Sequence, residues 1–294
     1  MGVRHLNKYI TSNCSGVQSI ELSSLSNRKI VIDTSIYLYK YKAIGLLLVN
    51  MEKMIQLFAK FSICPIFVFD GKPSELKQPT LDSRKEKKKE AWKKYKELTK
   101  TIPEDSLVYL KPQFTKVSKL DVFQVKKIMD SFGANYIDAP NEADEICAML
   151  MLTNQVYACM SDDMDMFIYG CVRIIRNFNI DSNTADMYNL DIILTSLRMT
   201  LHEFRQVCVI SGTDYYSSSQ TLFDYIKLFN QYKRTPFVDF YDWLSFMGKI
   251  KNKNKLISSF NMFILPEQSH SATRSQSELL ELTSGNADSC TSAN

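Results

Sequence analysis

Residues 156–168, VYACMSDDMDMFI, combine the two features that decide the fold: an apolar run and a cluster of acids. The run at 156–160 is typical of a buried strand, and Asp162, Asp163 and Asp165 follow within five positions of its end. Three carboxylates so close to a buried strand repel one another unless something compensates their charge. A divalent cation would do so, because magnesium and manganese prefer hard oxygen ligands. The alternative is a helix N-terminus, where acids accept hydrogen bonds from exposed amides.

Composition sets only broad limits on function. The 294 residues are 45% hydrophobic and 23% charged, which is ordinary for a globular chain able to bury a sizeable core. The net charge is only +4, so a nucleic-acid or membrane surface must rest on local clusters of charge. The longest strongly apolar run, at 43–49, is too short to cross a bilayer. We expect neither a membrane partner nor a secretory signal.

Cysteine and histidine usage argues against zinc and against a disulfide framework. The seven cysteines include no CxxC pair, and the three histidines lie far apart in the sequence. This usage favours a reduced, intracellular compartment.

An acid at the end of a strand is a recurring pattern. Residues 29–33, KIVID, end on Asp33, and residues 64–70, CPIFVFD, end on Asp70 before the strand-breaking GKP. A third candidate strand at 134–140 leads into the acids that open a helix.

Strands alternate with helical segments along most of the chain. Helical spacing is present at 35–60 and 201–210, and further strands are predicted at 171–176 and 184–190. This alternation predicts an α/β fold with a mostly parallel central sheet flanked by helices. Ligands of such sheets bind outside the carboxyl ends of the strands, where four acids would project. These acids are Asp33, Asp70, Asp163 and Asp165.

A convergence of carboxylates is what a metal-dependent nuclease requires. Two divalent ions about 4 Å apart stabilise the attacking and leaving oxygens during displacement at phosphorus. Magnesium keeps much of its water, so six or seven acids are needed to hold two ions directly or through water. Within the helix start, Glu142 and Glu145 share a face, whereas Glu142 and Asp144 point about 200° apart. Spacing alone therefore favours Glu145 as the second metal ligand beside Glu142, unless Glu142 lies in an irregular first turn.

The connection at 77–127 is strongly basic. Its core at 84–100, RKEKKKEAWKKYKELTK, has nine basic and three acidic residues, with too few apolar positions for a core helix. A solvated helix with i,i+4 charge pairs is one explanation. The surplus of positive charge, with Trp92 and Tyr95 interleaved, favours contact with a nucleic-acid backbone. Further lysines extend this character: Lys111, Lys116, Lys119, Lys126 and Lys127.

The C-terminal third changes in composition. Residues 216–266 mix aromatic and basic residues in a mostly helical pattern, which packing alone could explain. Beyond these the chain becomes rich in Ser, Thr, Asn and Gln, so we expect 267–294 to be a poorly ordered tail.

Six motifs in fixed order resemble the flap endonuclease group of the XPG-type, structure-specific 5′ nucleases. They are MGVRHL, VIDTSIYLY, VFDGKPSELK, YIDAPNEADEICAML, SDDMDMF and VISGTDYY, spread over roughly residues 1–216. The resemblance implies a PIN-like 5′-nuclease fold, with one domain over 1–266. A helical arch would occupy 72–127, and a degenerate helix–two-turn–helix would occupy 211–266. A compact, divergent member of this kind would fit a large DNA virus.

The resemblance assigns roles residue by residue. It selects Asp144 rather than Glu145 and adds Asp214. The implied metal ligands are Asp33, Asp70, Glu142, Asp144, Asp163, Asp165 and Asp214. Lys77 and Arg84 match residues that reach the scissile phosphate, and Tyr39 matches an aromatic that stacks on a nucleobase. Further DNA contacts are expected at Lys85, Lys87, Lys88, Lys116 and Lys119. Asp162, where the family often has glutamate, is left as the capping acid.

Three departures from the family pattern affect the expected activity. Asp144 replaces a glutamate, which shortens the side chain by one methylene. Residues 217–222, SSSQTL, lack the glycines and proline of the family's duplex-binding hairpin, so backbone amides approach phosphate less closely. The tail lacks the paired aromatics of a sliding-clamp motif.

The implied function is magnesium-dependent cleavage of 5′ flaps in DNA replication, repair or recombination, with 5′→3′ exonuclease activity. Two Mg²⁺ ions would serve the reaction and Mn²⁺ would substitute. We expect a monomer that acts on branched or flapped DNA in the nucleus or at a cytoplasmic replication site. The alternatives are a four-way junction resolvase or an RNA endonuclease of the same fold, or a non-catalytic DNA-binding factor.

Overall fold

The computed structural model describes residues 2–265, and the chain divides into two compact units. The arch unit comprises residues 21–147 and 178–184. The C-terminal unit comprises, among the described residues, 2–20, 148–177 and 185–265. The predicted tail at 267–294 lies outside the described residues.

Three parallel strands form the centre of the arch unit. β2 (Lys29–Asp33), β3 (Cys64–Phe69) and β4 (Asn135–Asp138) lie in that spatial order. Asp33 pairs with Val68, and Phe69 pairs with Asp138, so the three strands end at one edge. These strands confirm the apolar runs as buried parallel strands.

Helices cover these strands within the same unit. A short 3₁₀ helix, η1 (Leu22–Leu25), precedes β2. The predicted helical pair at 35–60 is α2 (Thr34–Ala43) and α3 (Leu47–Lys60). α5 (Lys119–Ser131) packs against α3, and α6 (Ala143–Leu152) begins after β4.

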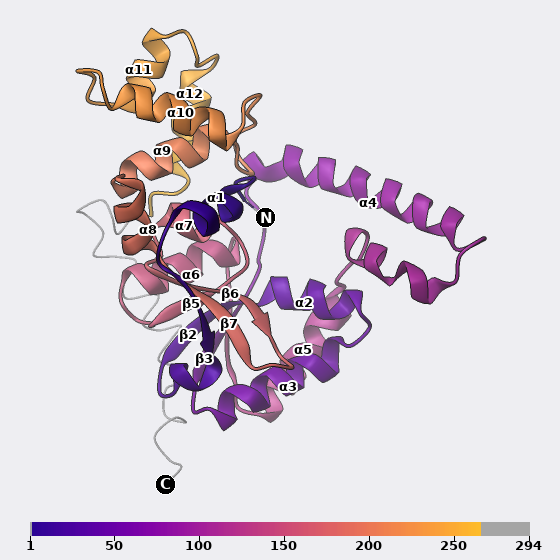
Figure 1. Ribbon diagram of the computed structural model, residues 1–294. Helices are drawn as coiled ribbons and strands as arrows, with labels where there is room; N and C mark the ends of the chain where they lie inside the picture. Colours follow the sequence, from indigo (N-terminus) through magenta and orange to yellow (C-terminus); the bar gives the residue numbers. More distant parts are fainter. Residues whose placement is uncertain (1, 266–294) are drawn as a thin grey trace. The chain divides into compact units, whose positions relative to one another are not determined.

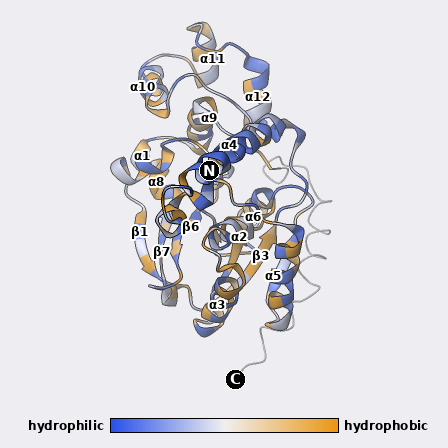
Figure 2. Cartoon of the chain, turned by 90° about the vertical axis from the view of Figure 1, so that its right-hand side faces the viewer, coloured by the Kyte–Doolittle hydropathy of each residue, from blue (hydrophilic) through white to orange (hydrophobic). Residues whose placement is uncertain are grey.

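The arch is built from η2 (Glu75–Lys77), α4 (Gln78–Leu98) and η3 (Glu104–Gln113). Figure 1 shows α4 standing clear of β2 and β3, with the chain returning beneath it, and Figure 2 shows that α4 is predominantly hydrophilic.

The arch nevertheless has a core of its own, which corrects the expectation that this basic segment packs none. Tyr95 is buried with Leu107 and Leu110, and Leu98 and Phe114 pack against them. Because this cluster closes locally between α4 and η3, it needs only one short apolar face of the helix. Tyr95 is therefore a packing residue of the arch.

The C-terminal unit contains the strand that precedes the acid cluster at 162–165 and most of three further strands. β5 (Ala158–Met160) pairs in parallel with β6 (Arg173–Asn179), with Cys159 opposite Ile174. β7 (Thr184–Asn189) lies on the other side of β6. β1 (Val17–Glu21) comes next in order, and it was not predicted because none of its five residues is buried and their exposure does not alternate. Together these seven strands make the mostly parallel sheet of an α/β fold, as predicted.

The helices of the C-terminal unit confirm the helical character expected for 201–210 and 216–266. They comprise α1 (Leu6–Asn13), α7 (Asp165–Tyr169), α8 (Leu190–Leu197), α9 (Leu201–Ser211), α10 (Leu222–Tyr232), α11 (Phe240–Phe246) and α12 (Lys253–Asn261). Phe229, Tyr232, Phe240 and Trp243 are buried together, so the aromatic residues here pack a core. Within residues 2–265 no helix has the length and apolarity needed to span a membrane.

Candidate functional site

Four of the predicted metal ligands lie around the carboxyl edge of the arch unit's strands. Asp33 is the last residue of β2 and is 5% exposed, and Asp70 directly follows β3. Glu142 ends the loop that follows β4, and Asp144 is the second residue of α6. The parallel register therefore brings these loops to one edge, as the sequence predicted.

Asp70 joins two helix starts. Its Oδ2 accepts a hydrogen bond from Ser35 Oγ in α2 at 2.5 Å, and its Oδ1 accepts one from the Ala143 amide of α6 at 2.9 Å. The next residue, Gly71, donates from its amide to the Asn141 carbonyl at 2.6 Å. A Cβ at Gly71 would collide with the Ala139 carbonyl, so only glycine permits this approach between the β3 and β4 loops.

Glu142 precedes the first helical residue of α6, which is the irregular position that the sequence left open. It is not on the regular helix, so the 200° argument does not apply to it. Its carboxylate forms an ion pair with Lys77 Nζ, and the two side chains are only 8% and 14% exposed. A predicted metal ligand and a predicted phosphate contact are thus paired with each other. Burial, opposed by a hydrogen bond from Asn141 and aided by the charge of Glu142, raises the pKa of the neighbouring Glu145.

The acids after β5 are held by short-range hydrogen bonds in the C-terminal unit. Asp163 donates from its amide to Ser161 Oγ at 3.1 Å, and its Oδ1 accepts from the Asp165 amide at 3.1 Å. Both carboxylates are buried, with 5% and 4% of the residue exposed. Asp163 thus orients the first turn of α7, which begins at Asp165.

Asp162 has a different role from the one predicted. Its Oδ1 accepts a hydrogen bond from the Asn177 amide at 2.8 Å, and its carbonyl accepts one from Arg176 Nη2 at 2.9 Å. Both partners lie on β6. The expectation that Asp162 caps the following helix was wrong, because its side chain satisfies a strand amide instead.

Gly2 is a site residue that sequence reasoning did not single out. A Cβ at this position would collide with Asp165 Oδ1 and lie 2.7 Å from Asp163 Oδ1. Its φ of 75° also belongs to the left-handed region that favours glycine. Gly2 therefore lies against both carboxylates, an approach that a residue with a side chain could not make. The available signal was the glycine within MGVRHL.

Asp214 lies in the turn that follows α9. Gly212 ends the helix with φ 112°, and the Thr213 amide donates to the Tyr216 carbonyl at 2.9 Å. In the altered hairpin, Ser218 Oγ accepts from the Gln220 amide at 3.1 Å. Thr221 then caps α10 with a capping box. Side-chain hydrogen bonds thus organise a loop that lacks the glycines and proline of the family pattern.

The carboxylates do not form a complete metal centre within the described residues. No three His, Cys, Asp or Glu side chains among residues 2–265 are grouped so that they could hold a metal ion. The predicted donors are nonetheless all carboxylates, which suits a hard divalent cation. The donor chemistry therefore fits a hard divalent cation.

The predicted DNA contacts of the arch surround Lys88. Its Nζ lies 4.7 Å from the centroid of the Tyr39 ring and donates to the Thr115 carbonyl at 3.1 Å. Burial, followed by the positive charges of Lys116 and Arg84, lowers the pKa of Lys88. Like charges are thus gathered at one side of α4. The remaining predicted contacts, Lys85, Lys87 and Lys119, are exposed.

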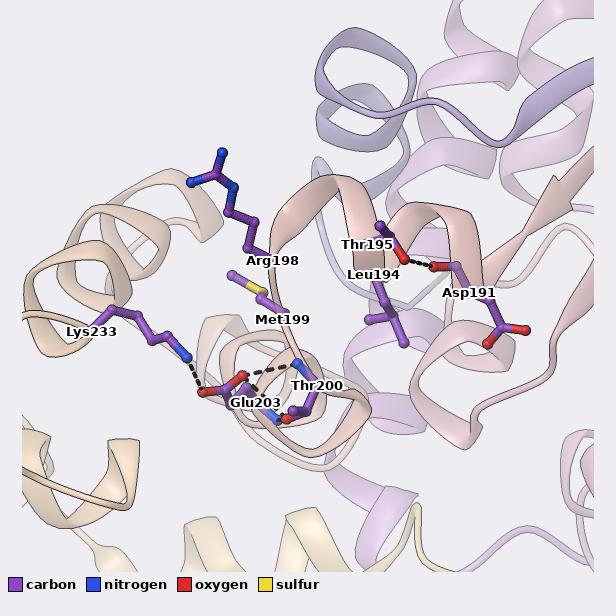
Figure 3. A pocket seen from close by; sticks show the side chains of 8 residues that line it. All are labelled: Asp191, Leu194, Thr195, Arg198, Met199, Thr200, Glu203 and Lys233. Carbon is purple, nitrogen blue, oxygen red and sulfur yellow. Dashed lines mark hydrogen bonds and ion pairs between the residues drawn. The ribbon is translucent and has the colours of Figure 1, made fainter.

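A pocket of about 570 Å³ in the C-terminal unit contains an ion pair between Glu203 and Lys233. Figure 3 shows Glu203 between Thr200 and Lys233, with Arg198 pointing away from them. Glu203 accepts from the Thr200 amide at 2.9 Å and from Lys233 Nζ at 2.8 Å. Burial alone would raise the pKa of Glu203, but these hydrogen bonds outweigh it and lower the pKa. The ion pair fastens α10 to α9, so we assign this pocket a structural role.

Comparisons with known proteins place these residues in context. The XPG N-terminal domain matches residues 1–91, and the XPG I-region matches residues 133–214. Flap endonuclease 1 of Encephalitozoon cuniculi is 29% identical over 236 residues, covering 74% of this chain and 68% of that protein. Flap endonuclease 1 of Aedes aegypti is 30% identical over 237 residues, covering 74% and 62%. The chain thus spans between three fifths and about two thirds of the length of these relatives.

A solved structure shows that the fold is shared. The catalytic core of Rad2 in complex with a DNA substrate matches with a TM-score of 0.65 at 21% identity. The match covers 97% of this chain and 95% of that one. The described elements therefore correspond to a known arrangement of strands and helices.

Proposed function

Since this chain belongs to the XPG-type family of structure-specific 5′ nucleases, we propose that it cleaves branched DNA at the base of a 5′ flap. The proposal includes 5′→3′ exonuclease activity and a place in DNA replication, repair or recombination. The observation that carries it is the set of acids at one edge of three parallel strands, with Lys77 paired to one of them. A nuclease needs acids and a cation together in this way, because it must bind metal and phosphate at one place.

The proposed cofactor is a pair of Mg²⁺ ions, for which Mn²⁺ substitutes. When bound, such ions make a water molecule more acidic and stabilise charge on phosphate oxygens. Asp33, Asp70, Glu142 and Asp144 of the arch unit and Asp163, Asp165 and Asp214 of the C-terminal unit are the proposed ligands. Several of them are already oriented by their own chain. Asp70 is held by Ser35 and Ala143, and Asp163 is held by the Asp165 amide.

The cations of the arch unit would receive the substrate phosphate. Lys77 is held by Glu142, and a substrate phosphate would compete with that carboxylate for its ammonium group. Arg84 would add a second cation that stabilises negative charge as the bond breaks. Tyr39, which is 43% exposed, would stack on a base next to the cut, and Lys85, Lys87, Lys88, Lys116 and Lys119 would follow the strand.

The proposed partner is branched or flapped DNA. We propose that a monomer acts with residues 1–266 as one nuclease domain, inside the cell in the nucleus or at a cytoplasmic replication site. Recruitment by a sliding clamp and contact with a membrane are not part of the proposal.

A cleavage assay on defined substrates tests the proposal. We expect a 5′-labelled flap to release a short product with Mg²⁺ or Mn²⁺ and to remain intact with EDTA. Asp163→Asn should reduce cleavage more than about 100-fold, because even partners of metal ligands contribute 10- to 100-fold. Asp162→Asn is the matched control, since this neighbouring acid bonds to β6, and it should cleave within about threefold of wild type. Equal activity of the Asp163 variant and wild type would remove the metal assignment.

The altered hairpin at 217–222 motivates a second candidate within the same chemistry. The side chains of Ser218 and Thr221 organise this loop. Its backbone amides would approach duplex phosphates less closely than those of a glycine-rich loop. The same assay should therefore include gapped DNA, a four-way junction and single-stranded RNA. Faster cleavage of the junction or the RNA than of the flap would favour a resolvase or an RNA endonuclease. Metal-dependent DNA binding without any cleavage would favour a non-catalytic binding factor.

A further inference from the structure

The arch unit contains a cavity of about 580 Å³ between α2, α4 and the end of η3. Small-molecule sites in proteins occupy roughly 300 to 1,000 Å³, so the space suits a ligand of nucleotide size. The cavity lies wholly within one unit, and its lining residues come from two chemical classes.

One side of the cavity is apolar. Trp92, Phe114 and Ala43 line it, and Trp92 is 43% exposed. The indole packs nearly parallel to Tyr95, with centroids 5.8 Å apart, and meets Phe114 edge-on at 5.1 Å. Tyr95 belongs to the buried arch core, so the aromatic wall is fixed from behind. A fixed, partly exposed aromatic wall is suited to a planar heterocycle.

The other side is cationic. Three of its lysines are compensated by nearby acids, since Lys42 pairs with Asp121, Lys85 with Asp82 and Lys89 with Glu86. Lys88, Lys111 and Lys116 have no carboxylate partner in the part of the chain that the structure describes. Lys88 is instead held in place by the Thr115 carbonyl at 3.1 Å. The cavity therefore presents three uncompensated cations to an anion, and Lys88 and Lys116 are two of them.

The cavity also adjoins the residue proposed to stack on a base beside the cut. Lys88 Nζ lies over the Tyr39 ring, 4.7 Å from its centroid. Burial, and then the charge of Asp70, raise the pKa of Tyr39. A strand that passes from the acids over Tyr39 would next meet Lys88 and the cavity.

We propose that this cavity is a subsite for one unpaired nucleotide, with the base against Trp92 and Phe114 and the phosphate on Lys88 and Lys116. The identification of the ligand as part of a nucleic-acid strand rests on the proposed nuclease function. The site adds a discrete base-binding position to the phosphate contacts of the arch. It would therefore favour a 5′ flap long enough to place a nucleotide in it.

Binding of 2′-deoxyadenosine 5′-monophosphate to the full chain in EDTA tests the subsite without any cleavage. The sequence has two tryptophans, and Trp243 is buried at 5% exposure in the C-terminal unit, so Trp92 reports on the cavity. We expect saturable quenching of Trp92 by the nucleotide, and at least about fivefold weaker binding of deoxyadenosine or inorganic phosphate alone. Trp92→Phe should abolish the quenching and leave the Trp243 emission unchanged.

Charge variants give the matched comparison. Lys88→Met should weaken nucleotide binding about tenfold, the order of one hydrogen bond to a charged group, and Lys116→Met should act in the same direction. Lys94→Met removes the same charge from α4, but Lys94 does not line the cavity, so the affinity should not change. Equal binding of nucleotide and inorganic phosphate, or equal effects of the Lys88 and Lys94 variants, would overturn the subsite. Because no cleavage is measured, that result is separate from failure of the nuclease proposal.

Discussion

The Lys77–Glu142 ion pair links the two kinds of residue that a phosphodiesterase needs. Both side chains are largely buried, so each charge depends on the other for compensation. Removing one member of a buried pair costs about 3 to 5 kcal/mol, because the remaining charge keeps its desolvation cost. In the proposed reaction the same lysine serves the phosphate, so a single residue supports both the fold and the activity.

A double-mutant cycle separates these two roles. Lys77→Met should lower the free energy of unfolding by about 3 kcal/mol, because it leaves Glu142 buried without this partner. Lys77→Met with Glu142→Gln should recover most of that stability, since neither charge remains. Flap cleavage should stay low in both variants. Urea unfolding and initial cleavage rates provide the two measurements, and recovery of cleavage together with stability would assign Lys77 a structural role only.

At the scale of elements, the arch depends on a small aromatic and aliphatic cluster. Tyr95, Leu107 and Leu110 are buried, and Phe114 packs onto Tyr95 with centroids 4.9 Å apart. α4 is otherwise strongly hydrophilic, so its tertiary stability derives from this one end. Helices without such packing are marginal in water.

Tyr95→Ala should therefore unfold the arch locally. Truncating a buried aromatic costs about 3 to 5 kcal/mol, more than a local element of this size can lose while remaining folded. Limited proteolysis should cut preferentially within residues 78–114, while Trp243 reports an unchanged C-terminal unit. Tyr109→Ala is the control, because this tyrosine is 69% exposed on the same arch and its loss should leave the cutting pattern unchanged. Arch protection equal to wild type in the Tyr95 variant would contradict this account.

The sequence predicted the strand ends well because their signal is local. Apolar runs such as 29–33 and 64–70 end on an acid, and parallel pairing then brings those ends to one edge. The arch core was not predicted, because Tyr95 meets Leu107 and Leu110 only after the chain turns back on itself. Gly2 was missed and Asp162 was wrongly assigned for the same reason. Their partners, Asp163 and Asn177, lie far along the chain or on another strand.

At the scale of the whole molecule, each unit contains a capping acid that is also paired with a lysine. In the arch unit Asp121 is part of the Ser118 capping box and accepts from Lys42 Nζ at 2.7 Å. In the C-terminal unit Glu203 plays the same part with Thr200 and Lys233. Burial by itself would raise the pKa of Asp121, but the bonds from Lys42 and Ser118 outweigh it and lower the pKa, as for Glu203.

A carboxyl whose pKa is lowered by folding stabilises the protein above its unfolded-state pKa, and this stabilisation is lost as the pH falls through the folded value. The ordinary pKa is 3.8 for Asp121 and 4.5 for Glu203. Each unit should therefore begin to lose stability as the pH falls below the ordinary pKa of its own carboxyl. Asp121→Asn should lower the free energy of unfolding of the arch unit at neutral pH by about 1 kcal/mol, the order of one ion pair. The same variant should lose less stability than wild type as the pH falls. Glu203→Gln should do the same for the C-terminal unit.

The two tryptophans allow these effects to be measured separately, because Trp92 lies in the arch unit and Trp243 in the C-terminal unit. Urea unfolding of Trp92→Phe and Trp243→Phe backgrounds between pH 3 and pH 7 then reports one unit at a time. Each carboxyl variant should flatten the acid dependence seen by the tryptophan of its own unit and leave the other unchanged. Equal shifts at both reporters would mean that the units unfold as one cooperative body, and unchanged acid dependence in both variants would remove these ion pairs as its cause.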